Sequence, residues 1–153
     1  MLPNESWGQL TTRWARLDAG GLDSVWSCDH FTNPHQPGQR WFEGIVSLAG
    51  LAQVTRRARI GLLVGAIVSR PPMLLAKQAL ALDHMSAGRL TIGLGAGGAP
   101  SDQAMWGVPP WSPSERVKRF GEYVELLDWV LRHDAGDYLG QWYRTERPAM
   151  APG

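Results

Sequence analysis

Apolar residues along this chain follow two patterns, helical spacing and short continuous runs. In the runs at 60–68 (IGLLVGAIV) and 90–94 (LTIGL) almost every residue is apolar, which is typical of strands that are covered on both faces. The shorter segment 23–28 (DSVWSC) is also expected to be a strand. Four apolar residues near the start lie three or four positions apart and predict one helical face: Trp7, Leu10, Trp14 and Leu17.

Three more helices are expected, at 42–57, 71–87 and 112–131. The last has the clearest start, because Ser112 and Glu115 have the spacing of a capping box and a proline stands at the first helical position. Its expected buried stripe is Val117, Phe120, Val124, Leu127 and Leu131. The core-facing residues of the helix at 42–57 are expected to be Ile45, Leu48, Ala49 and Ala52, with Leu51 as a further candidate. The segment 95–111 and the tail from residue 133 are expected to be irregular.

Strands that alternate with helices pair in parallel through right-handed crossovers. The connections at 29–41 and 95–111, both from a strand to a helix, are long. In parallel α/β folds ligands bind where the strands end, so these loops are the expected binding site. A doubly wound sheet and a (β/α)8 barrel both fit the pattern. Because a complete barrel needs roughly 250 residues, the length of 153 residues favours the doubly wound sheet.

Composition argues against several classes of protein. Fifteen Lys and Arg against fourteen Asp and Glu leave a net charge of +1, which provides no excess of cations for nucleic-acid phosphates. Cys28 is the single cysteine, which excludes an internal disulfide and a cysteine-based zinc site, and the four histidines have no metal-ligand spacing. No apolar run is long enough for a membrane span, and the N-terminus does not resemble a signal peptide. We therefore expect a cytoplasmic protein that binds neither nucleic acid nor membranes.

The turn after the last expected strand, 93–98 (GLGAGG), fits the spacing G-x-G-x-x-G by count. A dinucleotide-binding fold needs a helix that opens directly at this turn, but Pro100 follows it and the next clear helix start is Ser112. Two other interpretations remain open. The glycines allow a strand end to pack tightly against its neighbours, or their missing side chains leave room for a flat ring system.

Asp29 and His30 directly follow the first expected strand, at the expected ligand end. A histidine beside a carboxylate can serve acid–base chemistry or orient a polar ligand. The structural alternative is that Asp29 caps the loop and His30 packs at its rim. Three tryptophans lie in or beside the long loops, where a ligand could stack on them: Trp41, Trp106 and Trp111.

Three segments together are similar to a known family: 24–31 (SVWSCDHF), 59–98 (RIGLLVGAIVSRPPMLLAKQALALDHMSAGRLTIGLGAGG) and 112–131 (SPSERVKRFGEYVELLDWVL). They resemble the bacterial luciferase-like monooxygenase superfamily, which includes flavin-dependent monooxygenases and oxidoreductases that use the deazaflavin coenzyme F420. The resemblance runs almost continuously from about residue 7 to residue 142, and its most specific part is the block 74–97.

The resemblance implies an α/β fold that is part of a TIM (β/α)8 barrel, in place of the doubly wound sheet. The whole chain, residues 1–153, would form a single incomplete domain, about the first half of the barrel, with its first strand largely missing. Such a half exposes strand edges and a sheet face, on which Val25, Leu63 and Ile67 are expected. We therefore expect a homo-oligomer or assembly with a complementing C-terminal half.

The resemblance also implies a cofactor site for FMN or coenzyme F420, without a metal. His30 matches a histidine near the reactive face of the ring and is the expected catalytic residue. The family's third strand carries a non-prolyl cis peptide that backs the ring, and by position this is Leu63–Val64. The residues expected to bind the cofactor are Asp29, Leu63, Val64, Gly65, Gly95, Ala96, Gly97 and Gly98.

Two departures from the family pattern bear on function. Some F420-dependent relatives have a proton-donating Glu right after the glycine turn, where this chain has Gly98 and the next acidic residue is Asp102. The loops that commonly bind phosphate follow strands seven and eight of a barrel, so the chain alone is expected to bind its cofactor weakly. Two functions stay open: a flavin- or F420-dependent oxidoreductase or monooxygenase acting on a small organic substrate, and a non-catalytic half-barrel that assembles with itself or a partner.

Overall fold

The computed structural model describes residues 4–97, 100–133, 136–146 and 150–151. In chain order its elements are α1 (Trp7–Ala19), β1 (Ser24–Asp29), α2 (Gly44–Val54), β2 (Arg59–Ala66), α3 (Pro72–Ser86), β3 (Leu90–Gly95), α4 (Pro100–Met105), α5 (Pro113–Arg132), β4 (Tyr138–Leu139) and β5 (Arg144–Thr145). They form two compact units, Met1–Ala66 with Leu82–Leu94, and Ile67–Ala81 with Gly95–Gly153.

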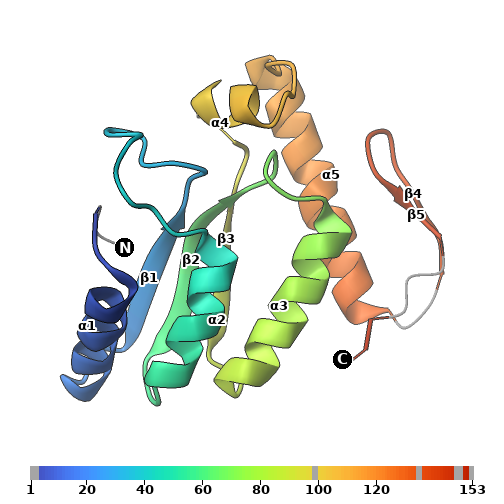
Figure 1. Ribbon diagram of the computed structural model, residues 1–153. Helices are drawn as coiled ribbons and strands as arrows, with labels where there is room; N and C mark the ends of the chain where they lie inside the picture. Colours follow the sequence, from blue (N-terminus) through green and yellow to red (C-terminus); the bar gives the residue numbers. More distant parts are fainter. Residues whose placement is uncertain (1–3, 98–99, 134–135, 147–149, 152–153) are drawn as a thin grey trace. The chain divides into compact units, whose positions relative to one another are not determined.

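The three long strands form one parallel sheet in the order β1-β2-β3 (Figure 1). In the first unit, α1 and α2 contact each other and both contact β1, so they cover the same face of the sheet. Strands adjacent in chain order with helices on one face are the arrangement of part of a (β/α)8 barrel. A doubly wound sheet would instead reverse its strand order and carry helices on both faces, so the preference based on length alone was wrong.

The core of the first unit lies between α1, α2 and the helix-facing side of the sheet. Its largest fully buried side chains are Leu10, Trp14, Leu48, Leu51, Ile60 and Leu62. Val25 is paired with Ile60 and is buried with it, which corrects the expectation that Val25 lies on the uncovered face. Leu63 and Val64 are exposed, so β2 is not covered on both faces as its apolar sequence predicted. Ile67, in the second unit, is buried rather than exposed.

Two charged side chains hold the bends at the end of the first unit where β2 and β3 begin. The buried Asp18, near the end of α1, accepts hydrogen bonds from the backbone N–H groups of Arg56, Arg57 and Ala58 at 2.8, 2.9 and 2.7 Å. Arg89 donates to the Thr55 hydroxyl and to four backbone carbonyls, those of Ala52, Thr55, Ala58 and Ser86. Backbone groups left without partners at the end of α2 are thereby satisfied.

The second unit is built around α5, which begins as predicted. The Ser112 hydroxyl accepts from the Glu115 N–H at 3.2 Å, while the Glu115 carboxylate pairs with Arg119 one turn later. The predicted buried stripe was wrong in part, because Val117, Val124 and Leu131 are exposed. The side chains that α5 buries are Tyr123, Leu126, Leu127 and Val130.

The hairpin formed by β4 and β5 and the short helix α4 both lie in segments that were expected to be irregular. Hairpin aromatic residues pack on α5, with ring centroids 5.6 Å apart for Tyr143 and Tyr123 and 6.0 Å apart for Tyr138 and Trp129. Aromatic packing of this kind favours burial of the helix face that carries Tyr123. Among the described residues, no helix has the length and apolar character needed to cross a bilayer.

Candidate functional site

Asp29 ends β1 and is tied to the start of α2. Its carboxylate is buried, and Oδ1 accepts a hydrogen bond from the N–H of Gly44, the first residue of α2, at 3.3 Å. An anion is favoured at a helix N-terminus. In the sheet Asp29 pairs with Gly65, one residue beyond Val64. Asp29 therefore joins the end of β1, the end of β2 and the start of α2, which supports the structural role that the sequence left open.

Gly44 makes this arrangement possible, because a Cβ there would lie 2.7 Å from Asp29 Oδ1 and 2.7 Å from Leu62 Cδ1. We expect Gly44→Ala to lower the free energy of unfolding by about 1–3 kcal/mol, the range for overpacking a tight site. Gly8→Ala is the matched control, since a Cβ on Gly8 in α1 meets nothing within 4 Å. Denaturant unfolding measures both variants, and equal stability for the two would contradict the close packing of Asp29 against α2.

His30 follows Asp29 and is partly exposed. Its ring lies beside Trp41, with centroids 6.4 Å apart and planes inclined by 56°. The loop between them is ordered by the buried Asn33, whose side-chain oxygen accepts from the N–H groups of His35 and Gln36. The loop after β1 thus holds an imidazole at the ligand end of the sheet.

The peptide bond between Leu63 and Val64 is cis, at the position that the family resemblance implied. The side chains of these two residues are 56% and 39% exposed. They lie beside Gly93 of β3, where a Cβ would be 3.3 Å from Leu63 Cδ1 and 3.5 Å from Val64 Cγ1. Exposed aliphatic groups next to a strand position without a side chain give an apolar surface at this end of β2.

Gly95, Ala96 and Gly97 of the glycine turn belong to the second unit. The carbonyl of Gly95 accepts from the Ile67 N–H at 3.0 Å, and Ala96 is partly exposed. Gly97 has a φ of +76°, which favours glycine, and a Cβ there would lie 2.9 Å from Val68 Cγ1. Its missing side chain therefore allows tight packing, one of the two interpretations left open. Gly98 lies outside the described residues.

Arg116 contacts this turn and was not anticipated from the sequence. One terminal nitrogen of its guanidinium donates to the carbonyl of Gly97 at 3.1 Å. The sequence carries no signal for this contact, because Lys118 and Arg119 are cations in the same turns of α5. Trp111, one of the tryptophans expected to stack on a ligand, instead has the Arg119 guanidinium 4.6 Å from its ring centroid.

The register of β1 and β2 brings Asp29, His30 and the segment Leu63–Gly65 to the same end of the sheet. That the glycine turn meets them there stays a prediction, as does a cofactor-binding role for each of these residues. Within the described part of the chain no group of three or more His, Cys, Asp or Glu could hold a metal ion. The first unit alone thus combines an apolar surface, a histidine and a buried carboxylate at one strand end.

Comparison with known proteins places these features in a family. Residues 2–153 match the sequence profile of the family described as luciferase-like monooxygenase. A curated relative, 4-hydroxyprotoasukamycin monooxygenase from Streptomyces nodosus subsp. asukaensis, is 32% identical, and the match covers 78% of this chain and 34% of the relative. The chain thus spans only about a third of the length of this relative.

Solved structures show the same fold. An F420-dependent secondary alcohol dehydrogenase, solved with an F420–acetone adduct, matches with a TM-score of 0.88 and 20% identity over 97% of this chain and 46% of the other. The oxygenating constituent of 3,6-diketocamphane monooxygenase from Pseudomonas putida, solved with FMN, matches with a TM-score of 0.82 and 18% identity over 97% and 41%. Together with the profile match over nearly every residue, these findings show that the chain belongs to the luciferase-like monooxygenase family.

Proposed function

We propose that this chain supplies the ring-binding part of an oxidoreductase or monooxygenase that uses FMN or coenzyme F420 on a small organic substrate. The observation that carries the proposal is the exposed apolar surface of Leu63 and Val64, at the strand end that also carries His30. The relatives solved with FMN or with an F420 adduct support either cofactor.

In this function the cofactor supplies the redox chemistry, oxygenation with a flavin or hydride transfer with a deazaflavin. The protein holds the ring, excludes water and orients the substrate. Leu63 and Val64 would form an apolar wall against one face of the ring. His30 would donate a proton or a hydrogen bond to the substrate oxygen on which negative charge develops. Asp29, fixed by the Gly44 N–H, keeps the chain at His30 in place.

A complementing half-barrel is the partner that we propose for the uncovered face of the sheet. Trp26 of β1 lies across Gly61, because a Cβ on Gly61 would overlap the indole, and Trp26 is 38% exposed. Together with Leu63 and Val64 it leaves apolar side chains exposed on this face of the sheet. The same observation favours the second candidate function, a non-catalytic half-barrel that assembles with itself or a partner.

Titration of FMN and of F420 into the chain, alone and with a complementing C-terminal half from a relative, tests the proposal. We expect binding to be at least about 100-fold weaker for the chain alone, which is equivalent to roughly 2.7 kcal/mol, because barrel enzymes commonly hold phosphate groups with the loops after strands seven and eight. Light scattering on the chain alone should show dimers or larger species.

Two results would count against an enzyme. Tight binding by the isolated chain that is indifferent to His30→Ala would contradict both the site and the need for a second half. Assembly with the complementing half that restores neither binding of FMN nor binding of F420 would favour the non-catalytic half-barrel.

A further inference from the structure

The β4–β5 hairpin is too short to be stable by itself. Each strand has two residues, paired as Tyr138 with Thr145 and Leu139 with Arg144. Leu139, near the turn, is 84% exposed and contributes little to packing. Because even a longer two-stranded hairpin is only marginally stable in water, contacts outside the hairpin must hold its shape.

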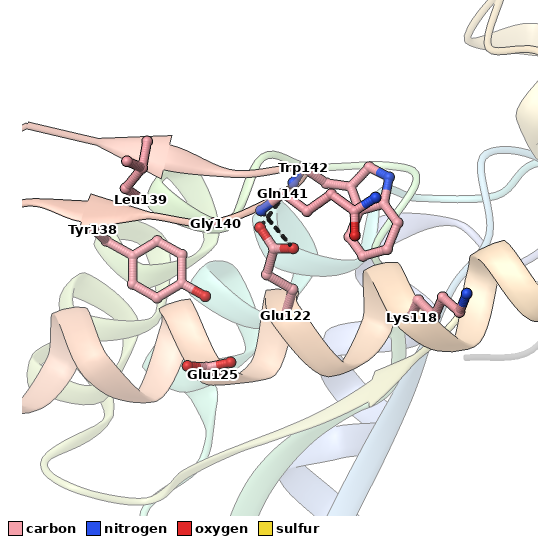
Figure 2. Close-up of a pocket in the computed structure, with 8 residues that line it drawn as sticks. All are labelled: Lys118, Glu122, Glu125, Tyr138, Leu139, Gly140, Gln141 and Trp142. Atoms are coloured by element: carbon pink, nitrogen blue, oxygen red, sulfur yellow. Dashed lines mark hydrogen bonds between the residues drawn. The ribbon is translucent and has the colours of Figure 1, made fainter.

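Glu122 of α5 provides the most concentrated of these contacts (Figure 2). Its carboxylate accepts three consecutive backbone N–H groups: Gln141 at 3.1 Å on Oε2, and Trp142 and Tyr143 at 2.9 and 2.7 Å on Oε1. A Cβ on Gly140 would overlap this carboxylate, so the close approach of the turn to Glu122 requires glycine at this position. Hydrogen bonds to an ionised acceptor are about twice as strong as neutral ones.

Arg119, one turn before Glu122, links the hairpin to the loop that precedes α5. Its guanidinium lies 5.6 Å from the ring centroid of Trp142 in the hairpin and 4.6 Å from that of Trp111 in the loop. Arg119 Nε also donates to Glu115 Oε1 at 2.9 Å, which fixes the guanidinium along the helix. Trp142 and Trp111 therefore both contact the guanidinium of Arg119. If Trp142 moves, Arg119 loses one of the cation–π contacts that hold it beside Trp111.

The hollow between α5 and the hairpin offers a matched control residue. It has a volume of about 530 Å³, and both Glu122 and Glu125 line it (Figure 2). Tyr138 lines the same hollow, and burial, followed by the negative charges of Glu125 and Glu122, raises the pKa of its phenol. Of these two carboxylates, only that of Glu122 accepts hydrogen bonds from the backbone N–H groups of Gln141–Tyr143 in the described part of the chain.

We propose that Glu122 is the anchor of the hairpin, and that the anchored hairpin positions the Trp111 loop through Trp142 and Arg119. The Trp111 loop, residues 106–112, connects α4 to α5, so Glu122 positions it through Trp142 and Arg119 without touching it directly. Glu122 and Arg119 are positioning residues in this scheme. The inference does not depend on the proposed function, because it concerns contacts inside the second unit.

Amide hydrogen exchange on the full chain tests the anchor. Glu122→Ala is expected to speed exchange at the amides of Gln141, Trp142 and Tyr143 at least about tenfold, since each loses its acceptor. Glu122→Gln keeps one oxygen and should give an intermediate increase. Glu125→Gln, the matched control, should leave these three amides unchanged.

Unchanged exchange at the three amides in Glu122→Ala would overturn the anchor. If that variant unfolds as a whole, Glu122→Gln decides the matter, since hairpin amides no faster than in the parent chain would equally overturn it.

Fluorine NMR of chain labelled with 5-fluorotryptophan tests the link to the loop. The resonances of Trp111 and Trp142 are assigned from Trp111→Phe and Trp142→Phe. Glu122→Ala should shift both resonances, and Glu125→Gln should shift neither. A shift of Trp142 alone would show that the hairpin is anchored by Glu122 but does not hold the loop, which would overturn the positioning part of the proposal.

Discussion

Replacing His30 with alanine, in the chain completed by a C-terminal half, is expected to lower kcat/KM by about 100-fold or more. A positioned proton donor or acceptor contributes roughly 10²–10⁴ to the rate, and His30 is the histidine at the strand end that carries the Leu63–Val64 surface. The measurement is oxidation of reduced FMN or F420, followed by absorbance, with a substrate that the completed protein accepts. Cofactor affinity should change far less than turnover, because the apolar wall remains.

His35→Ala is the matched control for this prediction. His35 lies in the same loop and is exposed, and its backbone N–H, which alanine keeps, donates to the side-chain oxygen of Asn33. Its replacement should leave kcat/KM within about twofold, as for surface substitutions away from special contacts. Equal losses for His30→Ala and His35→Ala would mean that the loop, rather than the imidazole of His30, matters for turnover.

Asp18→Asn is expected to lower the free energy of unfolding by about 2–3 kcal/mol at pH 7. The carboxylate accepts three backbone N–H groups at the bend into β2, and an amide cannot accept all three because its NH₂ group faces one of them. A donor left without a partner in a buried site costs about 1–3 kcal/mol. Denaturant unfolding provides the measurement, with Asp23→Asn as the control, since Asp23 is exposed and only five residues away.

The effect of Asp18 should depend on pH in a defined direction. Burial raises the pKa of Asp18, but hydrogen bonds from Ala58, Arg56 and Arg57 and the positive charge of Arg89 outweigh it, so the pKa lies below the ordinary value of 3.8. A lowered pKa means that the ionised carboxylate stabilises the fold above pH 3.8 and that this stability is lost as the pH falls through the lowered value. The difference between the parent chain and Asp18→Asn should be full at pH 6–7 and shrink below about pH 4. A difference independent of pH would contradict the role of the charge.

The sequence by itself determined the order of the helices and strands from α1 to β3 and the start of α5, because local signals specify them. Continuous apolar runs marked β2 and β3, and Ser112 with Pro113 marked the start of α5. The sequence also placed Asp29 and His30 at the ligand end, since residues that follow parallel strands lie at one edge. The family resemblance, and not the pattern, supplied the barrel and the position of the cis peptide.

Only the tertiary structure decided which face of each element is covered. Periodicity shows that Val117, Val124 and Leu131 share a face, but the aromatic residues of the hairpin make α5 bury the face of Tyr123 instead. The pairing of Val25 with Ile60 likewise placed Val25 under the helices.

Contacts between residues far apart in the chain were also invisible in the sequence. The bond from Gly44 to Asp29, that from Arg116 to Gly97 and those from residues 141–143 to Glu122 each join positions 15 or more apart. Side chains identical in type and local setting, such as Glu122 and Glu125, differ only in what the folded backbone brings to them. Local sequence fixes which residues share a surface, whereas the partner of that surface is set by long-range packing and by the need of buried polar groups for hydrogen bonds.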